Sequence, residues 1–238
     1  IFLIYLFIMP IFMSLKLIYF KMRALAEAPQ LLLHYTKIPY EYLMSWEYYK
    51  KDWTLVKPTI SFKQLPVLII DDKHEIAQSI AIMAFIEKMA NIDIKDKTTA
   101  AKADAITLSA QELFAPLNPT VNFAIGDDFL KKREDMKNFL LSRFDDLNRV
   151  ILSSGKKYFV GDTPQACDFA AFHHLDLSKK LDDTIIKKFP RLEKFLEDIA
   201  SIETIDKYLK NRPYLIDVGI EPKLVIKGNP HPTGTKQT

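Results

Sequence analysis

The chain has 238 residues, of which 48% are hydrophobic and 12% aromatic, which is enough to form the core of one large domain or two modest ones. It carries 33 Lys and Arg against 30 Asp and Glu, and the basic residues are scattered among the acidic ones. Nucleic-acid binding needs a concentrated basic face, so the composition argues against a nucleic-acid partner. A single cysteine, Cys167, excludes an internal disulfide and fits a reducing, cytoplasmic compartment.

The five histidines form no metal-binding motif. His173 and His174 are adjacent, so on a helix they point about 100° apart and cannot share an ion as an i, i+4 pair does. We therefore expect no metal.

Residues 1–12 are almost wholly apolar and precede Met13. The stretch is shorter than the roughly 20 apolar residues of a membrane helix, and it lacks the basic start of a signal peptide. We interpret it as a non-native or upstream leader, with Met13 (or, second, Met9) as the true start, and we expect no stable membrane insertion. A cleaved or anchoring leader is the alternative.

Residues 13–91 alternate between strand and helix patterns. Short apolar runs rich in strand formers alternate with one polar, aromatic stretch and two segments of helical period. The predicted order is strand 15–20, helix 23–35, strand 40–44, a long loop 45–63, strand 67–70, turn 71–73, strand 74–77 and a helix from Ser79. The pattern is βαβ followed by ββα.

Strand signals disappear after the polar connector 91–97. Helical periods occur at 104–115, at 136–151 and around 192–199, and Thr163-Pro164 reads as an N-cap that starts a helix running to about Lys179. Residues 98–213 are therefore predicted to form an all-α domain. Proline and glycine recur in residues 214–238, which predicts an extended or disordered tail and no further element.

No glycine precedes Gly126, so the first domain holds neither a P-loop nor a dinucleotide fingerprint. Pro66 stands at the entrance of an apolar strand, where a cis peptide bond is plausible. Taken with other short motifs in order, this segment resembles the glutathione transferases, most closely their sigma-like group. The motifs are Leu17-Ile18-Tyr19-Phe20, Arg23 with Ala26-Glu27, Trp53-x-x-x-Lys57, Gln64-Leu65-Pro66-Val67-Leu68, Ala77-Gln78-Ser79, Phe159-Val160-Gly161-Asp162, Ala166-Cys167-Asp168-Phe169, Phe189-Pro190-Arg191-Leu192 and Asn211-Arg212-Pro213.

The resemblance implies a thioredoxin-like glutathione-binding domain followed by an all-helical domain, with glutathione as co-substrate. It implies that Tyr19 is catalytic, since the family uses a tyrosine hydroxyl at the end of its first strand to stabilise the glutathione thiolate. It also implies a homodimer in which Asp104 reaches the partner's glutathione. The residues expected to hold the tripeptide are Trp53, Lys57, Gln64, Leu65, Pro66, Gln78, Ser79 and Asp104.

Two positions depart from the family's usual Arg-Gly-Arg-Ala-Glu. Ala24 stands in place of the glycine, and Leu25 in place of a cation near the thiolate. A cation there helps to lower the pKa of the bound thiol, so we expect this chain's bound thiol to titrate higher and its turnover to suffer.

The resemblance implies conjugation of glutathione to hydrophobic electrophiles, a detoxification reaction, in a pocket lined by Phe20, the region 114–123 and the tail. One alternative is glutathione-dependent isomerisation, as in the prostaglandin D synthases of the same group. Another is a non-catalytic binding or structural protein, as the lens crystallins derived from this group are.

Overall fold

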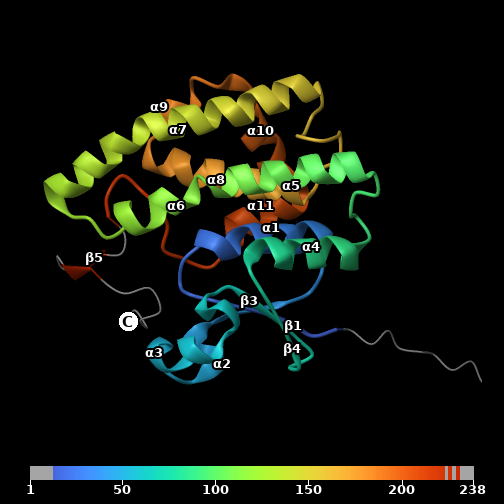
Figure 1. Cartoon of the computed structure of the whole chain (residues 1–238), viewed down its shortest axis with the longest axis vertical. Helices are drawn as coiled ribbons and strands as arrows, with labels where there is room; N and C mark the ends of the chain where they lie inside the picture. Colours follow the sequence, from blue (N-terminus) through green and yellow to red (C-terminus); the bar gives the residue numbers. More distant parts are fainter. Residues whose placement is uncertain (1–12, 223–224, 227–228, 231–238) are drawn as a thin grey trace, which may run out of the picture.

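The computed structural model describes residues 13–222, 225–226 and 229–230. A domain that contains a sheet is followed by a helical domain, and Figure 1 shows one stacked on the other. The predicted α/β plus all-α organisation is therefore confirmed. The expected leader, residues 1–12, lies outside the described residues.

The four predicted strands form one mixed sheet in the order β2-β1-β3-β4. Their bounds are β1 (Leu15–Tyr19), β2 (Glu41–Met44), β3 (Val67–Ile70) and β4 (His74–Ala77). β1 pairs with β2 in parallel and with β3 antiparallel, and β3 pairs antiparallel with β4. Every residue of β3 is buried, which is why that strand is apolar on both faces.

Two helices separate the sheet from the helical domain: α1 (Glu27–Thr36) and α4 (Ser79–Ala90). They pack on each other, and α1 also packs on α8 and α11 of the second domain. A 3₁₀ turn, Ala24–Ala26, connects β1 to α1. The βαβ-ββα order expected of a thioredoxin-like domain is present.

The predicted long loop at 45–63 is wrong. This segment folds into α2 (Ser45–Tyr49), α3 (Trp53–Val56) and two 3₁₀ turns, Lys57–Thr59 and Ser61–Lys63. None of these pieces exceeds five residues. A helix this short is less than two turns long and gives no apolar period to detect in the sequence.

The second domain is all helical around α8, most of whose residues are buried. Its elements are α5 (Lys97–Gln111), α6 (Phe114–Pro116), a π-helical turn (Leu117–Val121), α7 (Gly126–Ser154), α8 (Ala166–Leu181), α9 (Asp183–Ile186), α10 (Pro190–Ala200) and α11 (Glu203–Asn211). α5, α7 and α10 all pack against α8. In the part of the chain that the structure describes, no helix has both the length and the apolar character to cross a membrane.

Several details of these helices differ from prediction, and α9 was not predicted. α5 begins seven positions earlier than expected, because the Asp96 side chain caps it by accepting the Thr99 N–H at 2.8 Å. α8 begins at Ala166, two residues beyond the predicted proline start. α11 was not predicted, although Ile205 and Tyr208 are buried on one face at a helical spacing of three.

The start of the tail is extended, as expected, but it is anchored to the first domain. The Ile216 N–H donates to the Lys21 carbonyl at 3.0 Å, and the Arg23 N–H donates to the Ile216 carbonyl at 3.0 Å. Further on, two short strands, β5 (Val225–Ile226) and β6 (Asn229–Pro230), pair with each other, so the expectation of no further element is wrong.

A buried carboxylate, Asp168, organises the start of α8. One of its oxygens accepts the Gln165 N–H at 2.8 Å and the other accepts the Phe159 N–H at 2.9 Å. Burial raises the pKa of Asp168 from 3.8 to about 6, against the opposing effect of these two hydrogen bonds. The group therefore fixes the preceding loop onto the helix at the expense of a desolvated charge.

We predict that Asp168→Asn changes how stability depends on pH. The folded state binds the Asp168 proton more tightly than the unfolded state, so this group's contribution to the free energy of unfolding falls as pH rises from about 4 to about 6. In urea unfolding, the parent should lose up to about 3 kcal/mol relative to Asp168→Asn across that window. Exposed Asp162, whose pKa is lowered by the Lys157 N–H, supplies the control Asp162→Asn, with no difference in this window. Parallel curves for the parent and Asp168→Asn would contradict the prediction.

Candidate active site

Three residues of the predicted glutathione site lie at the same end of three neighbouring strands. Across β1, β3 and β4, three residues lie opposite one another: Ile18, Val67 and Ala77. Tyr19 follows the first of these, Pro66 precedes the second and Gln78 follows the third. Neighbouring strands are about 4.8 Å apart, so the antiparallel register brings these three residues together at one end of the sheet.

Tyr19 ends β1 with its hydroxyl in a sheltered position. Its side chain is 4% exposed, and its hydroxyl oxygen accepts the Leu25 N–H at 3.2 Å. Burial raises the pKa of Tyr19 above its usual value, so the hydroxyl is protonated at neutral pH. Because the oxygen already accepts one hydrogen bond, its own proton is available to donate to a sulfur anion.

The connection between β1 and α1 presents the Leu25 N–H to Tyr19. Ala24 lies within it at φ +26°, in the region that favours glycine, and the family pattern has glycine at this position. The Ala24 carbonyl accepts a hydrogen bond of 2.6 Å from Nε2 of His173. Burial lowers the pKa of His173 well below its usual value, so its ring is neutral and the proton lies on Nε2.

Leu65, Gln78 and Ser79 supply backbone or polar groups at the same end of the strands as Tyr19. The Leu65–Pro66 peptide bond is cis, as the sequence indicated. Gln78 is exposed at φ 72° and precedes α4, while Ser79 is buried with its hydroxyl 3.4 Å from Oε1 of Gln111. The N-terminus of α4, with its unpaired N–H groups, therefore lies at this end of the strands.

The remaining predicted residues differ in placement. The Trp53 ring packs edge-on against Phe20, with centroids 5.0 Å apart, which links α3 to the residue after Tyr19. Lys57 and Gln64 are exposed in the following turns. Asp104 is exposed on α5, in the other domain. Trp53 therefore lies beside the end of β1 that carries Tyr19, whereas Asp104 lies on a separate element.

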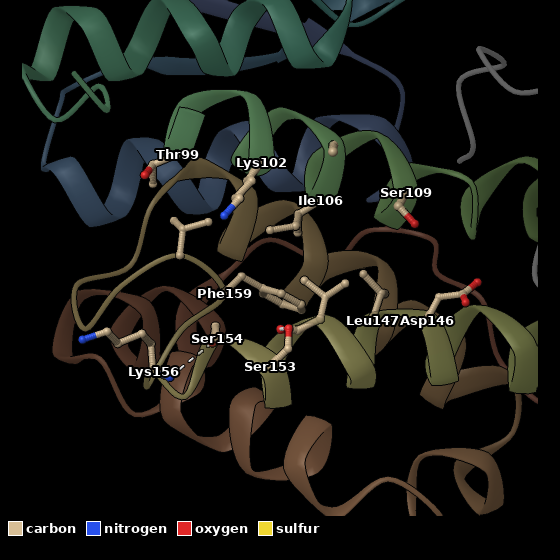
Figure 2. Close-up of a pocket in the computed structure, with 13 residues that line it drawn as sticks. Thr99, Lys102, Ile106, Ser109, Asp146, Leu147, Ser153, Ser154, Lys156 and Phe159 are labelled. Carbon is tan, nitrogen blue, oxygen red and sulfur yellow. Dashed lines mark hydrogen bonds between the residues drawn. The ribbon is translucent and has the colours of Figure 1, made fainter. Parts of the chain in front are cut away.

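A small cavity lies where the region 114–123 meets the tail, two of the parts predicted to line the electrophile pocket. This cavity of about 10 Å³ lies between Met22, Ala24, Phe114 and the tail residues Ile216 and Val218. The larger cavity in Figure 2, about 630 Å³, lies elsewhere, between α5, α7 and the loop before α8. Neither Tyr19 nor Phe20 lines this small cavity, so the electrophile pocket stays a prediction.

Sequence reasoning missed a buried ionic cluster behind the site. Glu27, 1% exposed, accepts a hydrogen bond from the Tyr208 hydroxyl and pairs with Arg212, each at 3.0 Å. Arg23, 3% exposed, lies 3.8 Å from Glu27 and also pairs with Asp217 in the tail. The i, i+4 spacing of Arg23 and Glu27 could have indicated an ion pair between them. Nothing in the sequence indicated their partners Tyr208, Arg212 and Asp217 near the other end of the chain.

We predict that Ala24→Gly stabilises the protein. Glycine relieves a backbone strain of about 1–3 kcal/mol, and this exceeds its extra entropy in the unfolded chain of about 0.4–1 kcal/mol. The free energy of unfolding should rise by about 1 kcal/mol in chemical denaturation. Ala26→Gly is the matched control, because Ala26 is equally buried but has helical backbone angles, and it should destabilise. Equal losses in both variants would rule out strain at Ala24.

Comparison with known proteins identifies the family of both domains. Residues 15–88 match the model for the glutathione S-transferase N-terminal domain, and residues 118–212 match the model for the C-terminal domain. Glutathione S-transferase Mu 4 of Homo sapiens is 29% identical over 211 residues, covering 85% of this chain and 94% of the relative. Both halves of the chain thus match the same family.

Solved structures share the fold. A glutathione S-transferase from the hookworm Necator americanus, described as monomeric, is 27% identical with a TM-score of 0.73, covering 84% of this chain and 98% of that one. The prostaglandin synthase D of Nilaparvata lugens is 20% identical with a TM-score of 0.71 and the same coverage, a likeness of fold alone. With two family domains in order and the strand ends converging on Tyr19, the chain belongs to the glutathione S-transferase family.

Proposed function

We propose that this protein conjugates glutathione to hydrophobic electrophiles and that Tyr19 stabilises the reacting thiolate. The observation that carries the proposal is the buried Tyr19 hydroxyl, which accepts the Leu25 N–H and keeps its own proton to donate. A cysteine thiol has a pKa of about 8.5, and the thiolate is the nucleophile, so a donor placed at the sulfur raises the reactive fraction at neutral pH.

The other residues near the end of β1 fit the remaining parts of the tripeptide. The Leu65 backbone, before a cis proline, offers its N–H and carbonyl to the cysteinyl part, as an added strand would. The α4 N-terminus at Gln78 and Ser79 favours the γ-glutamyl carboxylate. Lys57 is exposed and supplies a charge for the glycyl carboxylate beside Trp53. Gln64 lies next to Leu65 and completes the proposed set.

The isomerase alternative rests on fold likeness to a prostaglandin synthase at 20% identity, and the binding-only alternative on the two departures, Ala24 and Leu25. The Tyr19 hydroxyl keeps its hydrogen-bond donor in this chain, because the donor is the backbone N–H of Leu25 and not a side chain. Leu25 removes only the charge of the usual cation, so we expect a higher thiol pKa rather than a loss of the activity. The matches to glutathione S-transferase models in both domains favour conjugation.

We predict that Tyr19→Phe keeps glutathione affinity but lowers conjugation at pH 7 by about 100-fold, the scale for losing one preorganised donor to a developing anion. The measurements are glutathione affinity by calorimetry and the conjugation rate with a dinitro-substituted aryl chloride. The lost rate should return as pH rises, since the unaided thiol ionises above about pH 8.

Tyr35→Phe is the control for this experiment. It removes a phenol hydroxyl from α1, where the Tyr35 ring packs on Phe169 away from the strand end, and it should leave the rate unchanged. An unaltered rate in Tyr19→Phe would remove this hydroxyl from the mechanism.

We further propose a cytoplasmic homodimer of the sigma-like group in which Asp104 serves the partner's site. Asp104 is exposed on α5 and belongs to a different element from Tyr19, which supports a contact made across an interface. The hookworm relative is described as monomeric, so the oligomeric state is the first measurement, by sedimentation.

Mixed dimers test the Asp104 proposal. When an Asp104→Ala chain pairs with a Tyr19→Phe chain, the cross-subunit arrangement leaves one site complete, because Tyr19 of the first chain meets Asp104 of the second. We predict about half the parental rate with parental glutathione affinity in that site. A monomeric protein, or two impaired sites in the mixed dimer, would contradict the proposal.

A further inference from the structure

His173 belongs to the helical domain, but its side chain is bonded to the first domain. It lies on α8 with 1% of its surface exposed, and its Nε2 is 2.6 Å from the carbonyl oxygen of Ala24, in the connection between β1 and α1. A carbonyl oxygen only accepts hydrogen bonds, so Nε2 carries the proton. Burial, the adjacent His174 and the nearby Arg23 lower the pKa of His173 well below its usual value, so the ring stays neutral at pH 7.

The carbonyl of Ala24 and the N–H of Leu25 belong to one peptide unit. This peptide bond is trans, and in a planar trans unit the C=O and N–H bonds point in opposite directions. One end of the unit accepts from His173 at 2.6 Å, and the other end donates to the Tyr19 hydroxyl at 3.2 Å. The bond that holds the carbonyl therefore also sets the direction of the N–H.

This peptide unit has to be held, because the backbone beside it is in an unfavourable conformation. Ala24 has φ +26°, and residues other than glycine keep such angles only where the surrounding structure fixes them. The Arg23 N–H donates to a tail carbonyl at 3.0 Å, which fixes the residue before Ala24. His173 fixes the peptide unit after it. Without the bond from His173 the unit is free to rotate, and rotation turns the Leu25 N–H away from Tyr19.

The two hydrogen bonds also strengthen each other. A donor at a carbonyl polarises the peptide unit, and bonds in such a chain reinforce one another by about 10–30% each. Burial raises the pKa of Tyr19, and the hydrogen bond from the Leu25 N–H opposes that rise. A hydroxyl that accepts this bond therefore gives its own proton more readily to a sulfur anion. A chain of bonds runs from the His173 ring through one peptide unit to the Tyr19 hydroxyl.

The neighbouring His174 has the same burial without this contact. It is 2% exposed on the same helix, and burial lowers its pKa to about 3, so it is also neutral at pH 7. Its ring lies near Phe114, with centroids 6.1 Å apart, and its Nδ1 has no hydrogen-bond partner within the described chain. Two buried, neutral histidines thus stand side by side on α8, and of these two His173 is the one bonded to the connection.

We propose that His173 is a positioning residue for glutathione conjugation. It holds the Ala24 carbonyl so that the Leu25 N–H, at the other end of the same peptide unit, points at the Tyr19 hydroxyl. The hydroxyl proton is thereby kept directed at the sulfur of glutathione. This proposal rests on the proposed role of Tyr19 and adds to it a residue that touches neither the tripeptide nor the tyrosine.

The pKa of the bound glutathione thiol tests the proposal, measured from the ultraviolet absorbance of the thiolate against pH. His173→Leu removes the donor and should raise this pKa by about 1, so kcat at pH 7 falls about tenfold and recovers as pH rises. The KM for glutathione should not change, because no group that binds the tripeptide is lost. A loss of stability alone would reduce the amount of folded protein and leave the thiol pKa where it was.

Two further variants separate the hydrogen bond from the packing of the ring. His173→Gln places an Nε2 donor at the same number of bonds from the backbone and should recover most of the parental thiol pKa. His174→Leu makes the leucine change at the adjacent buried histidine and should leave this pKa unchanged. If His173→Leu does not fold, His173→Asn replaces it, because its amide is one methylene too short to reach the Ala24 carbonyl.

Exchange of the Leu25 amide proton with solvent, followed by NMR, is a second measurement that needs no glutathione. It should be faster in His173→Leu than in the parent and unchanged in His174→Leu. Parental exchange in His173→Leu would overturn the proposal.

The outcomes distinguish this proposal from the proposed function. If the parent does not lower the pKa of bound glutathione and Tyr19→Phe has no effect on rate, the proposed function fails and the positioning role fails with it. If Tyr19→Phe behaves as expected but His173→Leu keeps the parental thiol pKa, the role of His173 alone is overturned. An equal rise of the thiol pKa in His174→Leu would overturn that role as well.

Discussion

The buried Glu27 carboxylate connects the parts of this molecule that surround its candidate active site. An unpaired charge in this position would be costly, and breaking a buried pair by removing one partner typically destabilises by about 3–5 kcal/mol. Glu27 avoids that cost through the Tyr208 hydroxyl and Arg212, while the neighbouring Arg23 is paired with Asp217. The first turn of α1, α11 and the tail must therefore assemble together.

Contacts with this assembly also fix the backbone conformation of the connection between β1 and α1. Arg23 is bonded through its backbone to Ile216, and the Ala24 carbonyl is held by His173 from the centre of the helical domain. These contacts fix the backbone on both sides of a residue at positive φ. The Leu25 N–H then points at the Tyr19 hydroxyl. The donor that prepares the tyrosine is thus positioned by the second domain.

Long apolar runs made much of the fold predictable. The strands β3 and β4 occur where expected, because a buried strand needs an unbroken or alternating apolar run, and the seam of α7 from Met136 to Ile151 repeats every three to four residues. The elements missed were short, such as α3 and α11, or began at a polar cap, such as Asp96. α3 is too short for a period and depends on tertiary contacts, whereas α11 has an amphipathic pattern, with Ile205 and Tyr208 buried three positions apart, that the sequence analysis did not use.

The site residues next to predicted strands could be inferred from the sequence. The residues that reach the site from distant parts of the chain could not. Tyr19, Pro66 and Gln78 stand next to strands whose order could be inferred, so their meeting at one edge follows from sheet register. The role of His173 could not be inferred, because one histidine on a buried helix face looks like a core residue. The position of the tail beside Met22 and Ala24 could not be inferred either, because proline and glycine content does not determine it.

The anchored tail has a consequence for biosynthesis. Arg212 and Glu27 are 185 positions apart, and the backbone bonds of Ile216 to Lys21 and Arg23 span a similar separation. Since the ribosome delivers the N-terminus first, the sheet and α1 can form well before their last partners emerge. A nascent chain therefore carries Tyr19 without the contacts that fix the Leu25 N–H upon it. The hydrogen bond between the Leu25 N–H and Tyr19 is therefore fixed only after the segment that carries Arg212 and Ile216 has been synthesised.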